Sequence, residues 1–219
     1  TVKDVRLTGG GEIREVFAKN LENVEEGQRQ KLSRVIEKEI PEALKFIDAS
    51  ASRMDMLINA ILKLSRTDNR KIVHELIHTE DMVRGILNIM AQQIGSRGIS
   101  VTIEKLPNLV TDRIVVEQIF GNLLDNAVKY LDSGRQGEIA LTVELDDGQA
   151  IFHIRDNGRG MAAEDIPRAF ESFRRLGTQD VPGEGMGLAY VKTSIRKLGG
   201  RIWCESEPGK GTTFSFTIP

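Results

Sequence analysis

The chain has 219 residues, of which 40% are hydrophobic and 28% charged, as in an ordinary soluble globular protein of one large domain or two smaller ones. Its formal net charge of −2 at pH 7 gives no support to binding of nucleic acid or a membrane surface through a basic field. The single cysteine, Cys204, excludes an intramolecular disulfide and a cysteine-based zinc site, which favours a reducing, cytoplasmic setting.

The first 39 residues carry a weak helical signal. The string TGGG at residues 8–11 disfavours a helix, because each glycine there costs roughly 1 kcal/mol relative to alanine. Apolar residues then recur at helical spacing, at Ile13, Phe17, Leu21 and Val24. We therefore expect a helix from about residue 12, with Gly27 marking an interruption or a bend.

The segment 40–61 has a much clearer pattern. Apolar residues alternate at spacings of four and three, which is an a/d heptad seam: Ile40, Leu44, Ile47, Ala51, Met54, Ile58 and Ile61. Pro41 suits the first turn of such a helix, where its missing N–H is harmless. The seam predicts either a long helix packed in a core or a helical hairpin that dimerises into a four-helix bundle.

The polar residues 67–71 are expected to form an interdomain linker. Beyond it, patterning predicts helices at about 82–90, 112–131 and 191–198, and strands at 99–103, 138–144, 149–155, 201–206 and 212–218. Thr79 or Asp81 is the expected cap of the first of these helices. Together these elements predict an α/β sandwich with a mixed, mostly antiparallel sheet and helices on one face.

Four motifs follow one another in this second half. They are NLLDNAVKY at residues 122–130, DNGRGM at 156–161, GEGMGL at 183–188 and GKGTTF at 209–214. In this order and spacing they resemble the N, G1, G2 and G3 boxes of the ATP-binding domain of sensor histidine kinases. That domain belongs to the ATPase group that includes gyrase, Hsp90 and MutL. The string SRMDMLINAILKLSR at 52–66 is similar to the second helix of the histidine kinase dimerisation domain, which favours the dimerising hairpin.

On the helix of the first motif, Asn122, Asn126 and Lys129 share one face. Amide oxygens and a lysine provide what a magnesium–triphosphate needs, which is a hard oxygen ligand and a cation near the phosphates. The resemblance implies that Asn126 ligates Mg²⁺ and that Asn122, Lys129 and Tyr130 lie close to the nucleotide. Hydrolytic members of the group carry a glutamate base where this chain has Asn122. The site is therefore expected to transfer a phosphoryl group and not to activate water.

The other motifs imply the rest of a nucleotide site. Asp156 ends a predicted strand, where its carboxylate can accept a hydrogen bond from the adenine amine, and Gly158 and Gly160 allow backbone to approach the base. Phe170 and Phe173 match the family's F box and are equally suited to a core. Residues 176–184 form a polar loop typical of a mobile lid.

Glycines before the predicted helix 191–198 place backbone N–H groups where they can face phosphate oxygens. By resemblance the nucleotide-binding residues of the last two motifs are Gly183, Gly185, Gly187, Leu188, Gly211 and Thr212. No Gly-Lys-Ser/Thr follows these glycines, so the pattern is a lid-type glycine box and not a Walker P-loop.

The phosphoacceptor motif of histidine kinases is not legible in this chain. Its three histidines are His74, His78 and His153, and the string HELIH at 74–78 lacks the arginine and proline of that motif. Three explanations stay open. The acceptor helix lies upstream, it has been lost from or is unreadable in the first residues, or the protein binds ATP without phosphorylating itself.

We expect an α+β chain in which residues 12–66 form a dimerising helical hairpin and residues 72–219 a histidine-kinase-type ATP-binding domain. The resemblance implies ATP and Mg²⁺ as ligands and phosphoryl transfer to a histidine and then to a response regulator receiver domain. It also implies a homodimer. The alternative is an acceptor-less pseudokinase or dimeric scaffold that uses ATP as a conformational switch. No apolar run approaches the roughly 18 residues that span a bilayer, so membrane attachment is expected only through an upstream segment.

Overall fold

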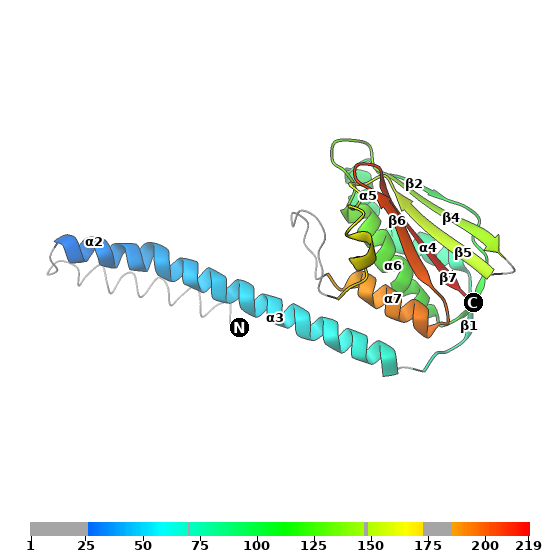
Figure 1. Cartoon of the computed structure of the whole chain (residues 1–219), viewed down its shortest axis with the longest axis horizontal. Coiled ribbons are helices and arrows are strands. Elements are labelled where there is room, and N and C mark those ends of the chain that lie inside the picture. The colour runs from blue at the N-terminus through cyan, green and yellow to red at the C-terminus, as the bar shows by residue number, and fades with distance from the viewer. Residues whose placement is uncertain (1–25, 70, 147–148, 173–184) are drawn as a thin grey trace. The chain divides into compact units, whose positions relative to one another are not determined.

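A computed structural model of the chain describes residues 26–69, 71–146, 149–172 and 185–219 (Figure 1). The chain divides into two units between Ile58 and Asn59. The domain bounds predicted from the sequence, 12–66 and 72–219, stay predictions. Within the described residues no helix is long and apolar enough to cross a membrane.

The first unit is helical in its described part. It contains α2 (Glu26–Arg34), a π-helical turn η2 (Val35–Glu39) and α3 (Ile40–Asn69), which continues beyond Ile58. The N–H of Ile40 bonds to the carbonyl of Val35, five residues back, and Pro41 directly after it has no N–H to donate. Proline therefore accounts for the widened turn, because its ring is incompatible with the ordinary bond to residue 37.

This helix confirms the periodicity predicted for residues 40–61, and it extends three residues into the expected linker at 67–71. The predicted first helix, with Ile13, Phe17, Leu21 and Val24, lies outside the described residues. The fold class is nonetheless confirmed, since a helical segment is followed by an α/β domain with a mixed sheet.

The second unit is built on a five-stranded sheet in the order β2-β4-β5-β7-β6. Its strands are β2 (Ser100–Ile103), β4 (Glu138–Asp146), β5 (Gln149–Asp156), β6 (Ile202–Glu207) and β7 (Gly211–Ile218). Only the β2–β4 pair is parallel; the other three pairs are antiparallel. The predicted mixed, mostly antiparallel sheet is therefore confirmed.

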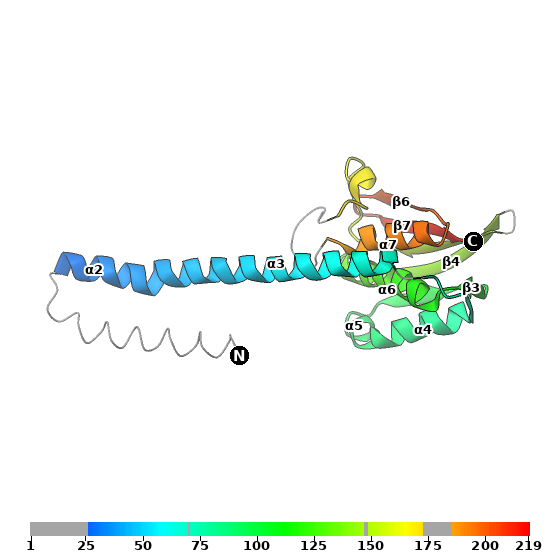
Figure 2. The same ribbon diagram turned by 90° about the horizontal axis from the view of Figure 1, so that it is seen from below.

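The remaining elements of the second unit are mainly helices. They are α4 (Thr79–Ile89), α5 (Ala91–Ser96), α6 (Arg113–Lys129), the 3₁₀ turn η3 (Ile166–Arg168) and α7 (Gly187–Lys197). Helices α6 and α7 lie along one face of the sheet, and α4 packs beside α6 (Figures 1 and 2). A short ribbon of β1 (Glu75–Ile77) and β3 (Leu109–Thr111) is absent from the prediction, because three-residue strands are too short to show alternation.

The core of this unit lies between the sheet and its helices. Three fully buried aromatic rings meet there: Phe120 of α6 has its ring centroid 5.5 Å from that of Phe152 on β5 and 5.3 Å from that of Phe216 on β7. Phe152 and Phe216 are cross-strand partners and stack at 5.3 Å. This cluster joins α6 to the centre of the sheet and so positions the N motif relative to the strand ends.

Candidate nucleotide site

Helix α6 positions the residues of the N motif. It begins at the cap Asp112, whose carboxylate oxygen accepts a hydrogen bond from the N–H of Val115 at 3.2 Å. Leu123, Leu124 and Val128 face the core and are almost completely buried, as predicted. The opposite, half-buried face carries the polar members of the motif, Asn122, Asn126 and Lys129.

The three polar side chains differ in their partners. The amide of Asn122 donates to the carbonyl of Gln118 at 2.7 Å, and the ammonium of Lys129 lies 2.5 Å from the Asp125 carboxylate. The side-chain amide of Asn126 makes no hydrogen bond to another residue that the structure describes. Of the two amides on this face, that of Asn126 thus has both its oxygen and its nitrogen without a hydrogen-bond partner among the described residues, whereas that of Asn122 uses its nitrogen.

The beginning of α7 lies against this face of α6. A Cβ on Gly187 would lie 3.1 Å from Oδ1 of Asn122, and the Tyr190 hydroxyl donates to the Gln118 side chain. The N-terminal N–H groups of α7 therefore start beside Asn122. Gly185, just upstream, has φ +68°, a conformation that favours glycine. Leu188 is half-buried against the core.

Asp156 ends β5 and is 5% exposed. Its Oδ1 accepts two backbone hydrogen bonds, from Gly158 at 2.8 Å and from Thr212 at 3.3 Å. Both bonds end on the same oxygen, and no donor among the described residues bonds to Oδ2. Burial raises the pKa of Asp156 to about 6, while the two backbone donors and the nearby Arg135 oppose this rise.

Glycines let the turn after Asp156 pack closely against its neighbours. A Cβ on Gly158 would lie 2.4 Å from the Tyr130 carbonyl oxygen at the end of α6. A Cβ on Gly160, which has φ +68°, would lie 2.0 Å from the carbonyl oxygen of Glu207, and one on Gly211 would lie 2.0 Å from that of Asp156. These glycines are required by contacts within the protein; a role in approaching a base stays a prediction.

Two residues that sequence reasoning missed connect these motifs. The hydroxyl of Ser206 on β6 contacts the Gly211 carbonyl at 3.0 Å and the Thr212 hydroxyl at 2.9 Å, and accepts from the N–H of Met161 at 2.8 Å. Arg135 donates to the carbonyl of Gly158 at 2.9 Å. Neither lies in a motif, and no local pattern marks them, because their partners lie in other segments of the chain.

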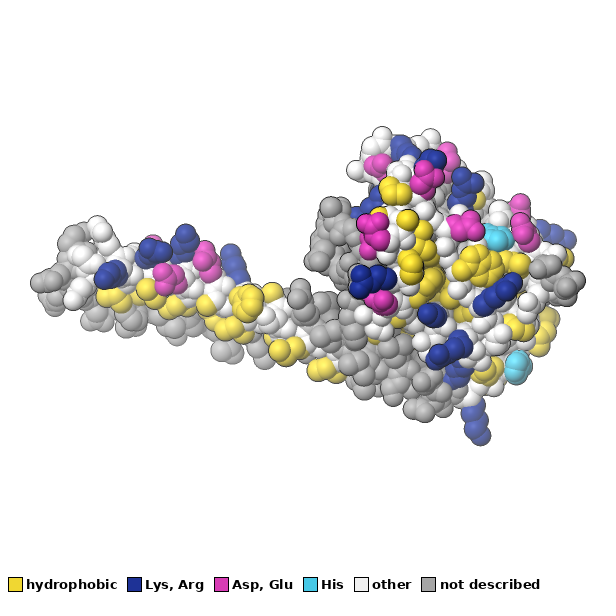
Figure 3. All heavy atoms as spheres, in the orientation of Figure 1, with side chains coloured by type: hydrophobic (Ala, Val, Ile, Leu, Met, Phe, Trp, Pro, Cys, Tyr) yellow, Lys and Arg dark blue, Asp and Glu magenta, His cyan; other side chains and the backbone are white. Residues whose placement is uncertain are grey.

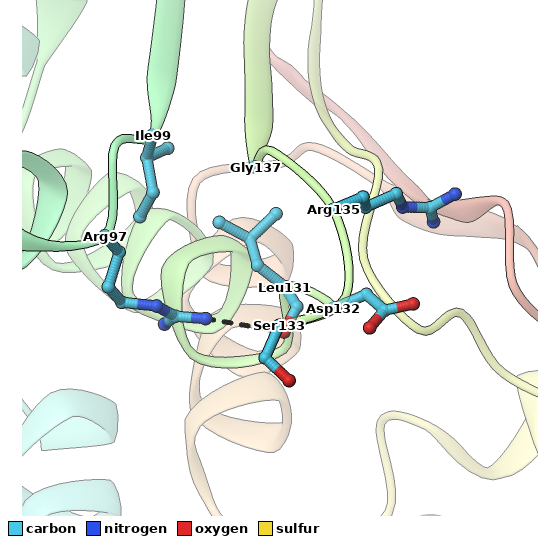
Figure 4. A pocket seen from close by; sticks show the side chains of 7 residues that line it. All are labelled: Arg97, Ile99, Leu131, Asp132, Ser133, Arg135 and Gly137. Atoms are coloured by element: carbon cyan, nitrogen blue, oxygen red, sulfur yellow. Dashed lines mark hydrogen bonds between the residues drawn. The ribbon is translucent and has the colours of Figure 1, made fainter.

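A hollow of about 180 Å³ lies at the end of α6 (Figure 4). It is lined by Arg97, Ile99, Leu131, Asp132, Ser133, Arg135 and Gly137. None of the site residues predicted from the sequence is among them, so this hollow is not the predicted nucleotide site. Arg97 donates from here to the carbonyls of Val128 at 2.6 Å and Leu131 at 3.4 Å, which caps the C-terminus of α6.

The predicted site residues that the structure describes therefore fall into three groups. Gly185, Gly187 and Leu188 lie at or just before the beginning of α7. Asn122, Asn126, Lys129 and Tyr130 lie on or at the end of α6, and Asp156, Gly158, Gly160, Gly211 and Thr212 lie at the end of the sheet beside them. The ring of Tyr130 lies under the Arg159 guanidinium at 4.7 Å, which brings the N and G1 motifs together. Phe173 and Gly183 lie outside the described residues, whereas Phe170 packs edge-on against Phe214 at 6.2 Å.

The histidines do not join these groups. His74 precedes β1, and His153 lies in β5 with its Nδ1 2.8 Å from the Ser215 hydroxyl. His78, and not Thr79 or Asp81 as predicted, is at the N-cap position of α4, where its side chain makes no capping hydrogen bond. Among the described residues, no three His, Cys, Asp or Glu side chains gather at a metal-binding distance. The assignment of Mg²⁺ to Asn126 stays a prediction.

This chain is similar to known proteins. Residues 111–219 match the family described as histidine kinase-, DNA gyrase B- and HSP90-like ATPases. The chain is 36% identical over 179 residues to cyanobacterial phytochrome A of Nostoc, covering 81% of this chain and 23% of that protein. It is 34% identical over 192 residues to the methanogenesis regulatory histidine kinase FilI of Methanothrix harundinacea, covering 87% and 22%. The chain thus spans about a quarter of these relatives.

Solved structures extend the similarity to both units. The crystal structure of full-length ShkA in complex with AMPPNP matches 97% of this chain and 45% of that one with a TM-score of 0.65 and 25% identity. The mycobacterial sensor histidine kinase MprB matches 66% of this chain and 97% of its own, with a TM-score of 0.56 and 25% identity.

Proposed function

We propose that this chain, whose residues 111–219 belong to the family of histidine kinase-, DNA gyrase B- and HSP90-like ATPases, is the catalytic core of a two-component sensor histidine kinase. In this proposal the second unit binds Mg-ATP and donates its γ-phosphoryl group to a histidine. An aspartate on a response regulator receiver domain then receives that group. The similar protein ShkA was solved in complex with AMPPNP, an ATP analogue, which supports the choice of nucleotide.

The observation that carries the proposal is the environment of Asp156. Its buried carboxylate is held through Oδ1 by two backbone N–H groups, and Oδ2 is left to accept the adenine amine. Guanine presents a carbonyl oxygen at the position of that amine, and a carboxylate repels it. In this proposal Gly158, Gly160, Gly211 and Thr212 shape the wall of the adenine pocket.

The other end of the nucleotide lies along α6 in this proposal. Asn126 holds Mg²⁺ together with phosphate oxygens, and the bound ion neutralises charge on the triphosphate. Asn122 and Lys129 contact the phosphates, and Lys129 exchanges its Asp125 partner for them. Tyr130 borders the nucleotide, as does Phe173, and Gly183, Gly185, Gly187 and Leu188 direct backbone N–H groups toward the phosphates.

The identity of residue 122 supports transfer over hydrolysis. An asparagine amide has no basic group that can take a proton from water at neutral pH, and the Asn122 amide is engaged with the Gln118 carbonyl. Water at the γ-phosphate is therefore not activated. A histidine imidazole needs no such base, because its ring nitrogen is a nucleophile when neutral.

The helical segment supplies the dimer in this proposal. Residues 12–66 form a hairpin that pairs with a second copy, and the receiver domain docks on the resulting bundle. The apolar seam supports this role, since Leu44, Ile47, Met54 and Ile58 are all more than half exposed in the single chain, where they form an apolar stripe along the helix (Figure 3). Residues 12–66 contain no histidine, so the acceptor in this proposal lies outside that segment, and an ATP-binding switch that does not phosphorylate itself stays the alternative.

One labelling experiment separates the two candidates. The chain is incubated with Mg²⁺ and ATP labelled at the γ-phosphate, and protein-bound label is tested for stability in acid and base. Label that is lost in acid and kept in base is phosphohistidine and supports autokinase activity at one of three histidines. No label, with ATP nonetheless bound, leaves the switch and an acceptor helix upstream of these residues, and labelling of a longer chain separates those two.

Nucleotide binding itself is tested with two variants. Asn126→Ala and Asp156→Asn are expected to weaken Mg-AMPPNP binding at least about a hundredfold, since each removes a partner for which the site offers no substitute. Asp81→Asn, on the exposed side of α4, is the matched control and binds normally. Unchanged affinity in both site variants contradicts the nucleotide site.

A further inference from the structure

The turn that follows Asp156 is held by Tyr130, the last residue of the N motif, and by residues 131–138, which lie outside the four motifs. The side chain of Asn157 accepts a hydrogen bond from the N–H of Glu138 at 2.8 Å and donates to the carbonyl of Gln136 at 2.9 Å. The N–H of Arg159 donates to the Tyr130 carbonyl at 3.0 Å. The conformation of this turn therefore depends on the conformation of the connection from α6 to β4.

Arg135 is the charged member of this connection. Its guanidinium donates to the Gly158 carbonyl at 2.9 Å, and it is the cation whose charge acts on Asp156. Figure 4 shows its side chain extending away from Leu131 and Arg97. The peptide between Gly158 and Arg159 is thus bonded at both ends, through its oxygen to Arg135 and through its nitrogen to Tyr130.

We propose that Arg135 is a positioning residue of the nucleotide site, which fixes the turn after Asp156 and supplies the positive charge that keeps this carboxylate ready for adenine. This inference rests on the proposed function, since it assigns Arg135 to the adenine end of the same site. Arg135 acts through Gly158 and Asp156 and need not contact the nucleotide.

Electrostatics explain why such a residue is needed. Burial raises the pKa of Asp156 to about 6, close enough to neutrality that a protonated fraction would compete with binding. Arg135 opposes that rise. The N–H of Gly158 also donates to Asp156, and a cation on the carbonyl of the same residue helps to hold it in place.

The other charged side chains around Asp156 do not take this role. On α6, Lys129 pairs with Asp125; on the β6–β7 hairpin, Lys210 pairs with Glu207 at 2.8 Å; on the turn, Arg159 lies over Tyr130. Asp132 lies in the same connection as Arg135 and accepts from the N–H of Gly134 at 2.9 Å. Glu138 is an anion, and Arg155 precedes Asp156 in β5, so that the Arg155 side chain points to the opposite face of the sheet.

The test compares three substitutions in the full chain. Arg135→Gln keeps a hydrogen-bond donor but removes the charge, and Arg135→Lys keeps the charge. Arg155→Gln is the matched control, because it removes the same charge from the residue next to Asp156 but on the opposite face. Affinity for Mg-AMPPNP is measured by calorimetry from pH 5.5 to 8, and the affinity of each variant is expressed as a ratio to that of the unmodified chain, so that titration of the nucleotide cancels. Thermal unfolding of each variant confirms folding.

The expected result is a loss that depends on pH. Arg135→Gln binds roughly fivefold more weakly at pH 7, and the loss grows as the pH falls toward 6, because more of Asp156 is protonated. Arg135→Lys restores the pH dependence of the unmodified chain, and Arg155→Gln matches it throughout. A ratio for Arg135→Gln that is near one, or that does not change with pH, overturns the inference while leaving the proposed function intact. Failure of the unmodified chain to bind AMPPNP overturns the proposed function itself.

Discussion

The two units of this chain differ in how far their apolar side chains are buried. In the helix α3, the described seam residues are about half exposed, from 45% for Ile40 to 62% for Met54. In the second unit, Phe120, Phe152 and Phe216 are fully buried between the sheet and α6. Apolar side chains are therefore covered by their own chain in one unit and left open to water in the other.

This difference indicates how each unit is stabilised. Burial of apolar surface contributes about 25 cal/mol per Å², so the second unit gains its stability from its own core. A single helix with a seam open to water gains little, because helix propensity alone is marginal. We expect the second unit to fold by itself and the helical segment to depend on a second copy.

The largest effect is expected from the aromatic cluster of the second unit. Phe152→Ala removes a ring that stacks on Phe216 and meets Phe120 edge-on, and it should lower the free energy of unfolding by about 3–5 kcal/mol. Urea denaturation followed by the fluorescence of Trp203 measures this change. Leu145→Ala, at a side chain that is 75% exposed on the neighbouring strand, is the control and should change stability by less than about 0.5 kcal/mol. Similar losses in both variants would contradict a self-sufficient core.

The buried Asp156 carboxylate should lower the stability of the nucleotide-free protein while enabling it to bind ATP. Its pKa is raised from 3.8 to about 6 in the folded chain, so the folded state binds the proton more tightly and loses stability as the pH rises through that window. Above pH 6 the penalty is about 3 kcal/mol. The side chain in Asp156→Asn is uncharged, so this variant does not carry that penalty.

The nucleotide-free Asp156→Asn variant should therefore gain stability relative to the unmodified chain between pH 4 and 6 and stay more stable at pH 7, while failing to bind ATP. Denaturation curves at several pH values measure the difference. A variant less stable at pH 7 than at pH 4, relative to the unmodified chain, would contradict the assigned burial.

In the helical segment, the seam is tested with a charge. Ile47→Asp places a carboxylate at the predicted dimer contact and should weaken dimerisation by about 2 kcal/mol per chain. Lys45→Asp, at an outer position of the same turn, is the matched control and leaves the dimer intact. Sedimentation equilibrium measures both. An undisturbed dimer in Ile47→Asp would show that the seam is not the interface.

The smallest effect is expected at the thiol of Cys204, which reports on the second unit alone. Burial raises its pKa to about 11, so it should react with a thiol reagent only when the second unit opens. The rate should be the same in Ile47→Asp as in the unmodified chain and slower with ATP bound. A faster rate in Ile47→Asp would mean that the two units do not have separate stabilities.

Sequence patterns predict the regular elements well where the signal is long. The strands β4 and β5 and the helix α6 lie within two residues of their predicted bounds, because each carries a full alternation or helical period. The helix α7 begins at Gly187, four residues earlier than predicted. Glycine has a low helix propensity, so the glycines of the G2 motif do not indicate a helix at this point. Ile89 belongs to the apolar pattern of its helix and is nevertheless 84% exposed.

Residues of the candidate site can be predicted from the sequence only where they belong to a local motif. Asn126 and Asp156 stand in recognisable strings, and their neighbours in space follow from the order of the motifs. Arg135 and Ser206 cannot be found in this way, because each bonds to a backbone group that only the folded connection or hairpin brings within reach. The positions of such residues depend on tertiary packing, which a short sequence motif does not encode.

The most direct test of the nucleotide site is a comparison of ATP and GTP binding to the full chain in the presence of Mg²⁺, by calorimetry at pH 7.5. We expect one ATP site per chain and GTP binding at least about a hundredfold weaker, because the Asp156 carboxylate accepts the adenine amine and repels the guanine carbonyl. Equal affinities, or no binding of ATP, would contradict the assignment of Asp156 and with it the nucleotide site.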